Sequence, residues 1–228
     1  MGADLAITVH SHHERAEVLA DTLKHLTELG LPRPSVSVQV TPPDPARNRL
    51  NARNALELAW PWPAGGVLML EDDVRLDADI HDWIAVARAL GRTTFFYSAY
   101  VRNHPGWFFA AHTQTPELMT PFARGLYRLE RPPELWGAQA VYLPRSVLAL
   151  MWQDERLHSE ELDGSPIDDF FRRFFTSVPK SQLPYLALPN PVEHLAPLSV
   201  VNKDRRQHYS ISRPYAHLAT GEGVTING

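Results

Sequence analysis

The sequence predicts an α/β fold with a mostly parallel central sheet and helices on both faces. Leu5–Val9 is a short β-prone run that leads into a helical pattern, and Ser35–Val40 alternates as a second strand would. Gly65–Leu70 is an apolar run opened by two glycines, which is typical of a buried strand. A strand, a helix and a second strand in this order predict a parallel βαβ unit.

Length, charge and composition limit the classes of protein to consider. A chain of 228 residues can form one well-buried core. Its 22 basic and 26 acidic residues give a net charge of -4, which excludes a global basic field that would recruit nucleic acid. The absence of cysteine excludes disulfides, thiolate zinc sites and a cysteine nucleophile. The sequence shows no signal-peptide pattern and no long apolar run, so we expect a cytoplasmic protein without a membrane span.

The first strand ends in a histidine-rich turn that precedes a helix. Ser11 and Glu14 form a capping-box pattern, and the helical spacing continues to Gly30. Because a helix N-terminus at the end of a strand suits a phosphate group, His10 and Arg15 are candidate ligand contacts. The alternative is a solvated turn without a ligand.

Three consecutive acids, Glu71, Asp72 and Asp73, close the buried strand. Open α/β sheets bind ligands at this end of their strands. Adjacent carboxylates repel one another, and a hard divalent cation such as Mg2+ or Mn2+ would neutralise them. The alternative is that the acids only leave the core and cap the next helix.

The segments around this strand offer weaker candidates. A helical pattern over Ala46–Trp60 contains Arg53 and Asn54, which could contact a nucleotide or form an ordinary exposed face. Thr94–Tyr100 is strongly β-prone. Residues 101–135 lose periodicity, so we expect a long loop-rich insertion, which is either functional or structural.

A further β-prone run, Trp136–Leu143, begins with Trp136, Gly137, Ala138 and Gln139. Small residues there would let a substrate approach the backbone.

Ser165 and Pro166 suit the N-cap and N1 positions of a helix, which places Asp168 and Asp169 in its first turn. A rigid helix would hold one of them as a general base, or both only interact favourably with the helix dipole. Adjacent helical residues point about 100° apart, so at most one should face the chemistry.

The C-terminal part contains a strand pattern, a histidine and a basic stretch. Leu183–Leu188 is the last predicted strand, and His194 follows it. We expect residues 1–200 to form a single domain and residues 201–228 a basic tail. Lys203–Arg213 either folds over an anionic ligand or is a solvated polar segment.

Taken together, this order resembles the nucleotide-sugar glycosyltransferases of GT-A fold. It looks closest to the lipopolysaccharide-biosynthesis family that also contains collagen galactosyltransferases, over about residues 4–196. The most specific parts are the strand that ends in Glu71-Asp72-Asp73 and the pair of segments GAQAVYL and PIDDF. The resemblance implies a Rossmann-like GT-A sheet, a DXD-type motif and Mn2+ or Mg2+ as the cofactor.

The resemblance also implies roles for individual residues. Glu71 and Asp73 would occupy the outer positions of the DXD motif, although Glu71 departs from the usual first aspartate. Asp73 and the late His194 would hold the metal. The donor nucleotide would be bound by His10, Arg15, Arg53, Asn54, Glu71 and Asp72. The sugar or acceptor would be bound by Trp136, Gly137, Ala138 and Gln139.

We therefore expect a metal-dependent glycosyltransferase, either a hexosyl- or a pentosyltransferase, that uses a nucleoside-diphosphate sugar. Asp169, or else Asp168, would be the base that activates the acceptor hydroxyl. The acceptor is a saccharide or another hydroxyl compound, or a hydroxymethylated base in phage-type DNA. A nucleotidyltransferase would have a phosphate-binding loop rich in glycine and basic residues after the first strand. This chain has Ser11-His12-His13-Glu14 there. An inactive sugar- or nucleotide-binding module is the remaining alternative.

Overall fold

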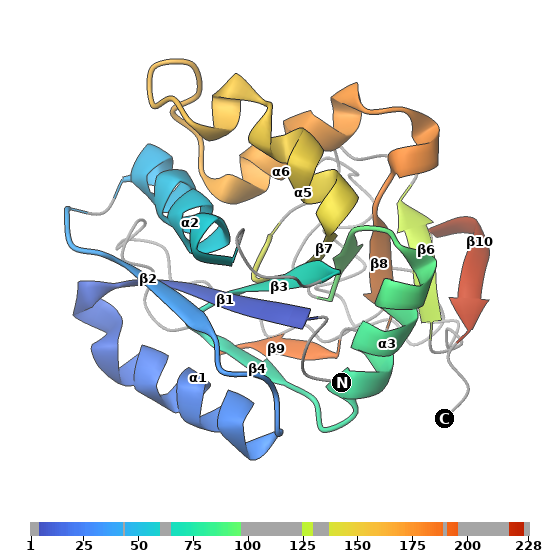
Figure 1. Ribbon diagram of the computed structural model, residues 1–228, viewed down its shortest axis with the longest axis horizontal. Coiled ribbons are helices and arrows are strands. Elements are labelled where there is room, and N and C mark those ends of the chain that lie inside the picture. Colours follow the sequence, from blue (N-terminus) through green and yellow to red (C-terminus); the bar gives the residue numbers. More distant parts are fainter. Residues whose placement is uncertain are drawn as a thin grey trace, which may run out of the picture.

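The computed structural model describes residues 5–42, 44–59, 65–96, 125–129, 137–188, 191–195 and 219–225. Its centre is an eight-stranded sheet with the order β10-β6-β8-β5-β7-β3-β1-β2 (Figure 1). These strands are β1 (Leu5–His12), β2 (Ser35–Gln39), β3 (Gly66–Glu71), β5 (Thr94–Phe95), β6 (Gly125–Leu129), β7 (Ala140–Pro144), β8 (Tyr185–Leu188) and β10 (Ala219–Thr225). A second sheet pairs β4 (Val74–Leu76) with β9 (Val192–His194) in antiparallel orientation.

Most strands of the central sheet run in one direction. β1 pairs in parallel with β2 and β3, and β5 pairs in parallel with β8. β7 runs against both β3 and β5, and β6 runs against both β8 and β10. Only β6 and β7 are therefore reversed among the described strands of this sheet, which confirms the predicted α/β fold with a mostly parallel sheet.

Helices cover both faces of the sheet, as Figure 1 shows. On one face lie α2 (Pro45–Ala59), α5 (Arg145–Trp152) and α6 (Ile167–Ser177), and on the other lie α1 (Ala16–Glu28) and α3 (Ile80–Leu90). Short 3-10 helices are η1 (His13–Arg15), η4 (Glu155–Leu157) and η5 (Lys180–Gln182).

The side chains of β3 point alternately to the two faces of the sheet, and they pack in two separate apolar cores. Val67 and Met69 pack in the core below α2, α5 and α6, whereas Leu68 and Leu70 pack in the core on the side of α1 and α3. All four side chains are fully buried. Because successive side chains of a strand point to opposite faces, a strand covered on both faces has a continuous apolar sequence, which explains the pattern at Gly65–Leu70.

The sheet includes two strands that the sequence does not predict. β6 lies inside the predicted loop-rich insertion of residues 101–135, and β10 lies inside the predicted basic tail of residues 201–228. The two strands pair with each other, so the sheet extends past the predicted domain boundary at residue 200. β10 has the sequence ATGEGVT, whose two glycines and few apolar residues give little β signal. The rest of the basic segment lies outside the described residues.

Among the described residues, no helix combines the length and the apolar character needed to cross a membrane.

Candidate functional site

The three acids lie at the end of β3, which is an inner strand of the central sheet. β3 ends at Glu71, and a turn through Asp72 and Asp73 leads directly into β4. Two distant segments fix this turn: the Glu71 amide donates to the Gln139 carbonyl at 2.9 Å, and the Leu195 amide donates to the Asp73 carbonyl at 2.8 Å. The turn therefore stands at the carboxyl end of β3, as predicted.

The first helical segment supplies a cation to this turn. The Arg15 guanidinium lies 2.6 Å from Asp73 and 3.1 Å from Asp72, and both carboxylates are almost fully buried. Although burial opposes it, the charges of Asp73 and Asp72 hold the pKa of Arg15 above its ordinary value, so Arg15 stays charged.

Hydroxyl groups fix Asp72 from two sides. The Ser11 hydroxyl donates to the Asp72 carboxylate, and the Thr22 hydroxyl donates to the Asp72 carbonyl at 2.6 Å. The predicted capping box is therefore wrong, because Ser11 bonds to Asp72 and the η1 amide of Glu14 donates to the ring of His12 instead.

The acids are costly to ionise together. Burial raises the pKa of Glu71 well above its ordinary value, and the charges of Asp73, Asp72 and Asp168 act in the same direction, against Arg15. Burial likewise raises the pKa of Asp72 to about 6, although Arg15 opposes this. A positive ligand would therefore be attracted to this turn.

An uncharged histidine, His10, lies beside the acids. Its Nε2 lies 3.8 Å from a Glu71 oxygen, and the side chain is buried. Burial lowers the pKa of His10 to about 4, so the ring is neutral at neutral pH. The structure thus brings the predicted residues His10 and Arg15 to the acid turn.

The two acids of α6 differ in their surroundings. Asp168 is close enough to Glu71 for its charge to raise the Glu71 pKa, and burial together with Asp169 raises its own pKa. Asp169 instead forms an ion pair with Arg172 at 2.5 Å, one turn along the helix. Of the two predicted base candidates, Asp168 is the one whose charge raises the pKa of Glu71 in the acid turn.

A buried arginine that the sequence does not single out holds the start of α6. Arg49, on α2, has no exposed surface and donates to the carbonyl oxygens of Ser165 at 2.5 Å and Ser159 at 2.8 Å. Its guanidinium also lies 3.9 Å from the Asp163 carboxylate. An arginine in a helical pattern is ordinarily expected at the surface, so no sequence signal identified this one.

The remaining predicted donor residues lie in other contacts. Arg53 donates to the Asn54 side chain and forms an ion pair with Glu57 at 3.6 Å, within its own helix. No contact between described residues joins Arg53 or Asn54 to the acid turn. It is Asn51, earlier on α2, that bonds to the Ser11 carbonyl.

The predicted sugar or acceptor segment is described in part. Trp136 lies outside the described residues. Gly137 has a positive φ of 86°, Ala138 is buried, and Gln139 holds Glu71 through its carbonyl. Gly137 therefore meets a backbone need, because a side chain is strained at such a φ.

The backbones of the two predicted metal ligands lie close together. His194 pairs with Val74 in the register of the small sheet, next to Asp73, but its side chain lies outside what the structure describes. The described side chains contain no group of three histidines or acids arranged to hold a metal ion. The metal at Asp73 and His194 stays a prediction.

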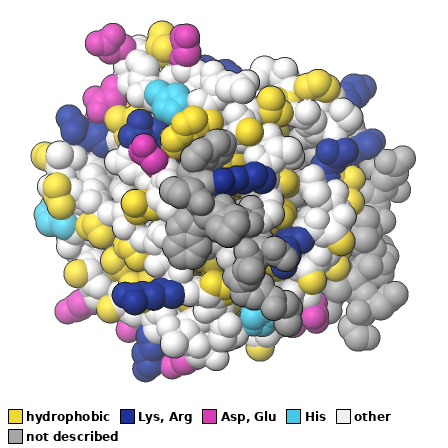
Figure 2. Space-filling model, viewed as in Figure 1, with side chains coloured by type: hydrophobic (Ala, Val, Ile, Leu, Met, Phe, Trp, Pro, Cys, Tyr) yellow, Lys and Arg dark blue, Asp and Glu magenta, His cyan; other side chains and the backbone are white. Residues whose placement is uncertain are grey.

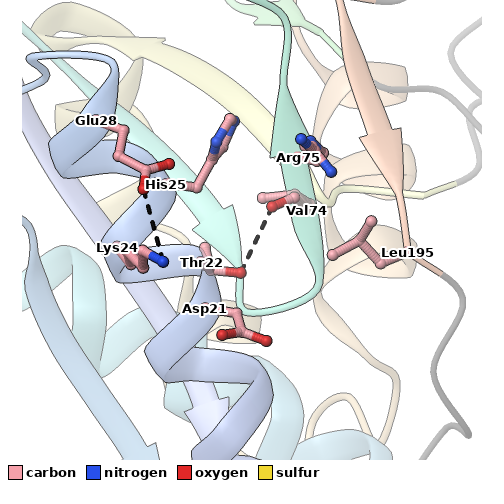
Figure 3. Close-up of a pocket in the computed structure, with 8 residues that line it drawn as sticks. All are labelled: Asp21, Thr22, Lys24, His25, Glu28, Val74, Arg75 and Leu195. Carbon is pink, nitrogen blue, oxygen red and sulfur yellow. Dashed lines mark hydrogen bonds and ion pairs between the residues drawn. The ribbon is translucent and has the colours of Figure 1, made fainter.

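A pocket of about 250 Å3 lies behind the acid turn, between α1 and β4. Figure 3 shows Thr22 pointing across it toward Val74, with His25, Arg75 and Leu195 around it. Its charged side chains are mixed in sign, since it is lined by Asp21 and Glu28 as well as Lys24 and Arg75.

Comparisons with known proteins assign neither a family nor a function to this chain. No protein-family model matches this chain, and neither does any curated protein. Among solved structures, the chain is similar to the crystal structure of a glycosyltransferase involved in the glycosylation of the major capsid of PBCV-1. The identity is 11% and the TM-score 0.45, and the match covers 87% of this chain and 97% of that chain. Chains with so little sequence in common often differ in function, so the functional proposal depends on the site itself.

Proposed function

We propose that this chain is a glycosyltransferase that moves a hexosyl or pentosyl group from a nucleoside-diphosphate sugar to an acceptor hydroxyl, assisted by a divalent cation. The observation that carries the proposal is the acid turn itself, where Glu71, Asp72 and Asp73 lie at the carboxyl end of β3 beside Arg15 and His10. Asp168, at the start of α6, is near enough for its charge to act on Glu71. Sugar transfer needs both a cation site for the leaving diphosphate and a base for the acceptor.

The residues of this region suit a hard divalent cation. Glu71, Asp72, Asp73 and Asp168 offer carboxylate oxygens, which Mg2+ and Mn2+ prefer. Ionised together, they carry four negative charges against the single charge of Arg15. We assign Asp73 and His194 as the ligands, with Glu71 beside them. When bound, the cation would act as a Lewis acid that stabilises charge on the departing diphosphate.

The chain's own groups would carry out the remaining steps. The acceptor oxygen attacks the anomeric carbon of the donor, the bond from that carbon to the diphosphate breaks, and the acceptor proton moves to a carboxylate. We assign this base to Asp168, because Asp169 is held by Arg172. The raised pKa of Asp168 brings it closer to neutral pH, which favours its use as a base. His10, being neutral, would line the donor site without adding charge.

No observation favours DNA as the acceptor. On the face shown in Figure 2, basic and acidic side chains are interspersed among the described residues. The aromatic and basic stretches on which a DNA acceptor depends lie mostly outside the described residues. The acceptor we propose is a saccharide or another hydroxyl compound.

The test is a thermal-shift screen with nucleoside-diphosphate sugars, each with Mn2+, with Mg2+ and with a chelator. A ligand that binds only the folded state raises the melting temperature, so we expect a metal-dependent rise with at least one donor. Asp73→Asn should remove that rise, and Arg156→Gln, at an ion pair with Asp154 elsewhere in the chain, should keep it. If no donor raises the melting temperature with either metal, the proposal is wrong. A metal-dependent rise without any release of nucleoside diphosphate would instead indicate a binding module that has lost catalysis.

A further inference from the structure

Arg15 lies where a cation held by the acid turn would be expected. Its guanidinium contacts Asp72 at 3.1 Å and Asp73 at 2.6 Å, bridging two consecutive carboxylates. Asp73 is also the residue assigned above to a divalent metal. A guanidinium and a divalent ion repel each other strongly at contact distance, and this repulsion is greatest where water is excluded.

We propose that Arg15 is an internal counter-cation that a divalent metal displaces from Asp73, which frees the guanidinium to bind the diphosphate of the donor. This inference rests on the proposed function, because it assumes that Asp73 holds a metal. It assigns Arg15 to two positions: on the acids in the metal-free protein, and on the donor's phosphates once the metal is bound.

The surroundings of Arg15 suit such an exchange. Arg15 ends η1 and directly precedes α1, only three residues after β1 ends at His12. β1 lies beside β3, with His10 opposite Glu71, so the end of β1 and the acid turn share one edge of the sheet. A diphosphate bound at this edge would lie within reach of a long arginine side chain, which forms bidentate contacts with phosphate oxygens.

The site also contains a buried polar group that the protein's own contacts leave unused. Neither buried ring nitrogen of His10 forms a hydrogen bond of good geometry with a described residue, although the Leu70 backbone lies nearby, and Nε2 lies 3.8 Å from Glu71. A buried polar group of this kind usually has a partner, either in the protein or in a bound ligand. Arg15 occupies the acid side of this site, and His10 lies beside Glu71 on its other side.

Mn2+ alone is the probe for the first test, with free Mn2+ measured by electron paramagnetic resonance. Without Arg15 the metal has no competitor, so Arg15→Gln should bind Mn2+ about tenfold more tightly than the wild-type protein, or more. Arg15→Lys keeps the charge and should bind Mn2+ close to the wild-type level. Arg156→Gln is the matched control for the loss of one positive charge, because its partner is Asp154; it should leave the Mn2+ affinity unchanged.

The outcomes separate this inference from the proposed function. Equal Mn2+ affinity in the wild-type and Arg15→Gln proteins would overturn the exchange and leave the metal site intact. Weaker binding in Arg15→Gln would also overturn it, because Arg15 would then support the metal site. If neither protein binds Mn2+, both the exchange and the metal-dependent part of the proposed function are wrong.

A second measurement uses the wild-type protein and does not depend on the folding of a variant. In protein labelled with 15N-arginine, the Nε–H resonance of Arg15 should shift as Mg2+ saturates the site, since the guanidinium leaves its two carboxylates. An unchanged Arg15 resonance at saturating Mg2+ would contradict the exchange. If Mg2+ does not bind, the resonance also stays unchanged and the exchange is contradicted together with the metal site.

Discussion

The guanidinium of Arg49 donates to the carbonyl oxygen of Ser165 at 2.5 Å, two residues before α6 begins at Ile167. A second donor nitrogen reaches the carbonyl oxygen of Ser159 at 2.8 Å. One buried side chain on α2 thus holds two points of the loop that leads into α6. Since Asp168 is the second residue of that helix, Arg49 helps to set where Asp168 stands relative to the acid turn.

Replacing Arg49 tests how much this anchor contributes to the fold. Arg49→Met keeps much of the side-chain volume but leaves the carbonyl groups of Ser165 and Ser159 without their buried donor and removes one of the cations beside Asp163. We therefore expect a loss of about 3 kcal/mol in the free energy of unfolding. The loss of unfolding free energy is measured by urea unfolding. Arg47→Met, at an exposed position of the same helix, is the control and should change stability by about 0.5 kcal/mol or less. Equal effects of the two substitutions would show that the buried anchor contributes nothing particular.

The two acids of α6 can be told apart by activity. Asp168→Asn removes the carboxylate whose charge acts on Glu71 and should lower release of nucleoside diphosphate from the donor by about 10²–10⁴-fold, while donor binding persists. Asp169→Asn removes an ion-pair partner of Arg172 and one of the charges that raise the pKa of Asp168, and it should cost less than about tenfold. Two quantities are measured with a donor found in the thermal-shift screen: the rate of nucleoside-diphosphate release reports activity, and the rise in melting temperature reports donor binding. A larger loss for Asp169→Asn would reverse the assignment and restore the preference that the sequence alone gives.

The raised pKa of Asp72 predicts the sign of a pH dependence. Burial raises this pKa from 3.8 to about 6, so the folded protein holds the proton to a higher pH than the unfolded chain does. Ionisation of Asp72 therefore favours unfolding, and its contribution to stability falls as the pH rises from about 4 to about 6. A shift of about two pKa units corresponds to about 3 kcal/mol.

Asp72→Asn removes this titration. With a chelator present, the free energy of unfolding of Asp72→Asn minus that of the wild-type protein should increase by about 3 kcal/mol between pH 4 and pH 7. His10, whose pKa is lowered to about 4, gives an opposite slope, but it does so in both proteins and cancels in the difference. Urea unfolding at a series of pH values measures the difference, and a value independent of pH would mean that Asp72 titrates normally.

The sequence predicts those parts of the site that depend on local patterns. The buried strand with its three acids is where the spacing places it, and Asp168 and Asp169 lie in the first turn of α6 as predicted. The predicted cap of α6 is wrong by one residue, because the N-cap is Pro166 and not Ser165. Each depends on a period of two or 3.6 residues and on a cap, which a single segment carries. The same reasoning places His10 near the end of the first strand, although β1 continues to His12, and places Arg15 directly before the first long helix.

Contacts between distant segments are not visible in such patterns. Ser11 looks like a helix cap because Glu14 follows at the right spacing, but its hydroxyl meets Asp72, sixty-one residues away. Arg49 and Arg53 look alike in the sequence of α2, yet one is fully buried and the other pairs with Glu57. Which face of a helix is buried against another helix is decided by packing, and the weak amphipathic pattern of α2 does not reveal it.

The strand that carries the acids also depends on a close approach that only glycine allows. A Cβ at Gly66 would lie 2.6 Å from Cζ of the buried Tyr142 ring, on the neighbouring strand β7. Gly66→Ala should therefore cost about 1–3 kcal/mol of unfolding free energy, because the ring or the strand must move. Gly164→Ala is the matched control, since a Cβ there meets nothing within 4 Å; it should be close to neutral.

A double-mutant cycle identifies Tyr142 as the source of that cost. Tyr142→Leu should itself destabilise the protein, because a buried aromatic ring is lost. In the Tyr142→Leu background, however, Gly66→Ala no longer meets the ring, so its cost should fall by about 0.5–3 kcal/mol, measured by urea unfolding. Additive effects would place the strain elsewhere. Since Gly66 begins the strand that ends at Glu71, a shift of β3 against β7 would also move the acid turn, and the coupling would link the packing of this strand to the geometry of the site.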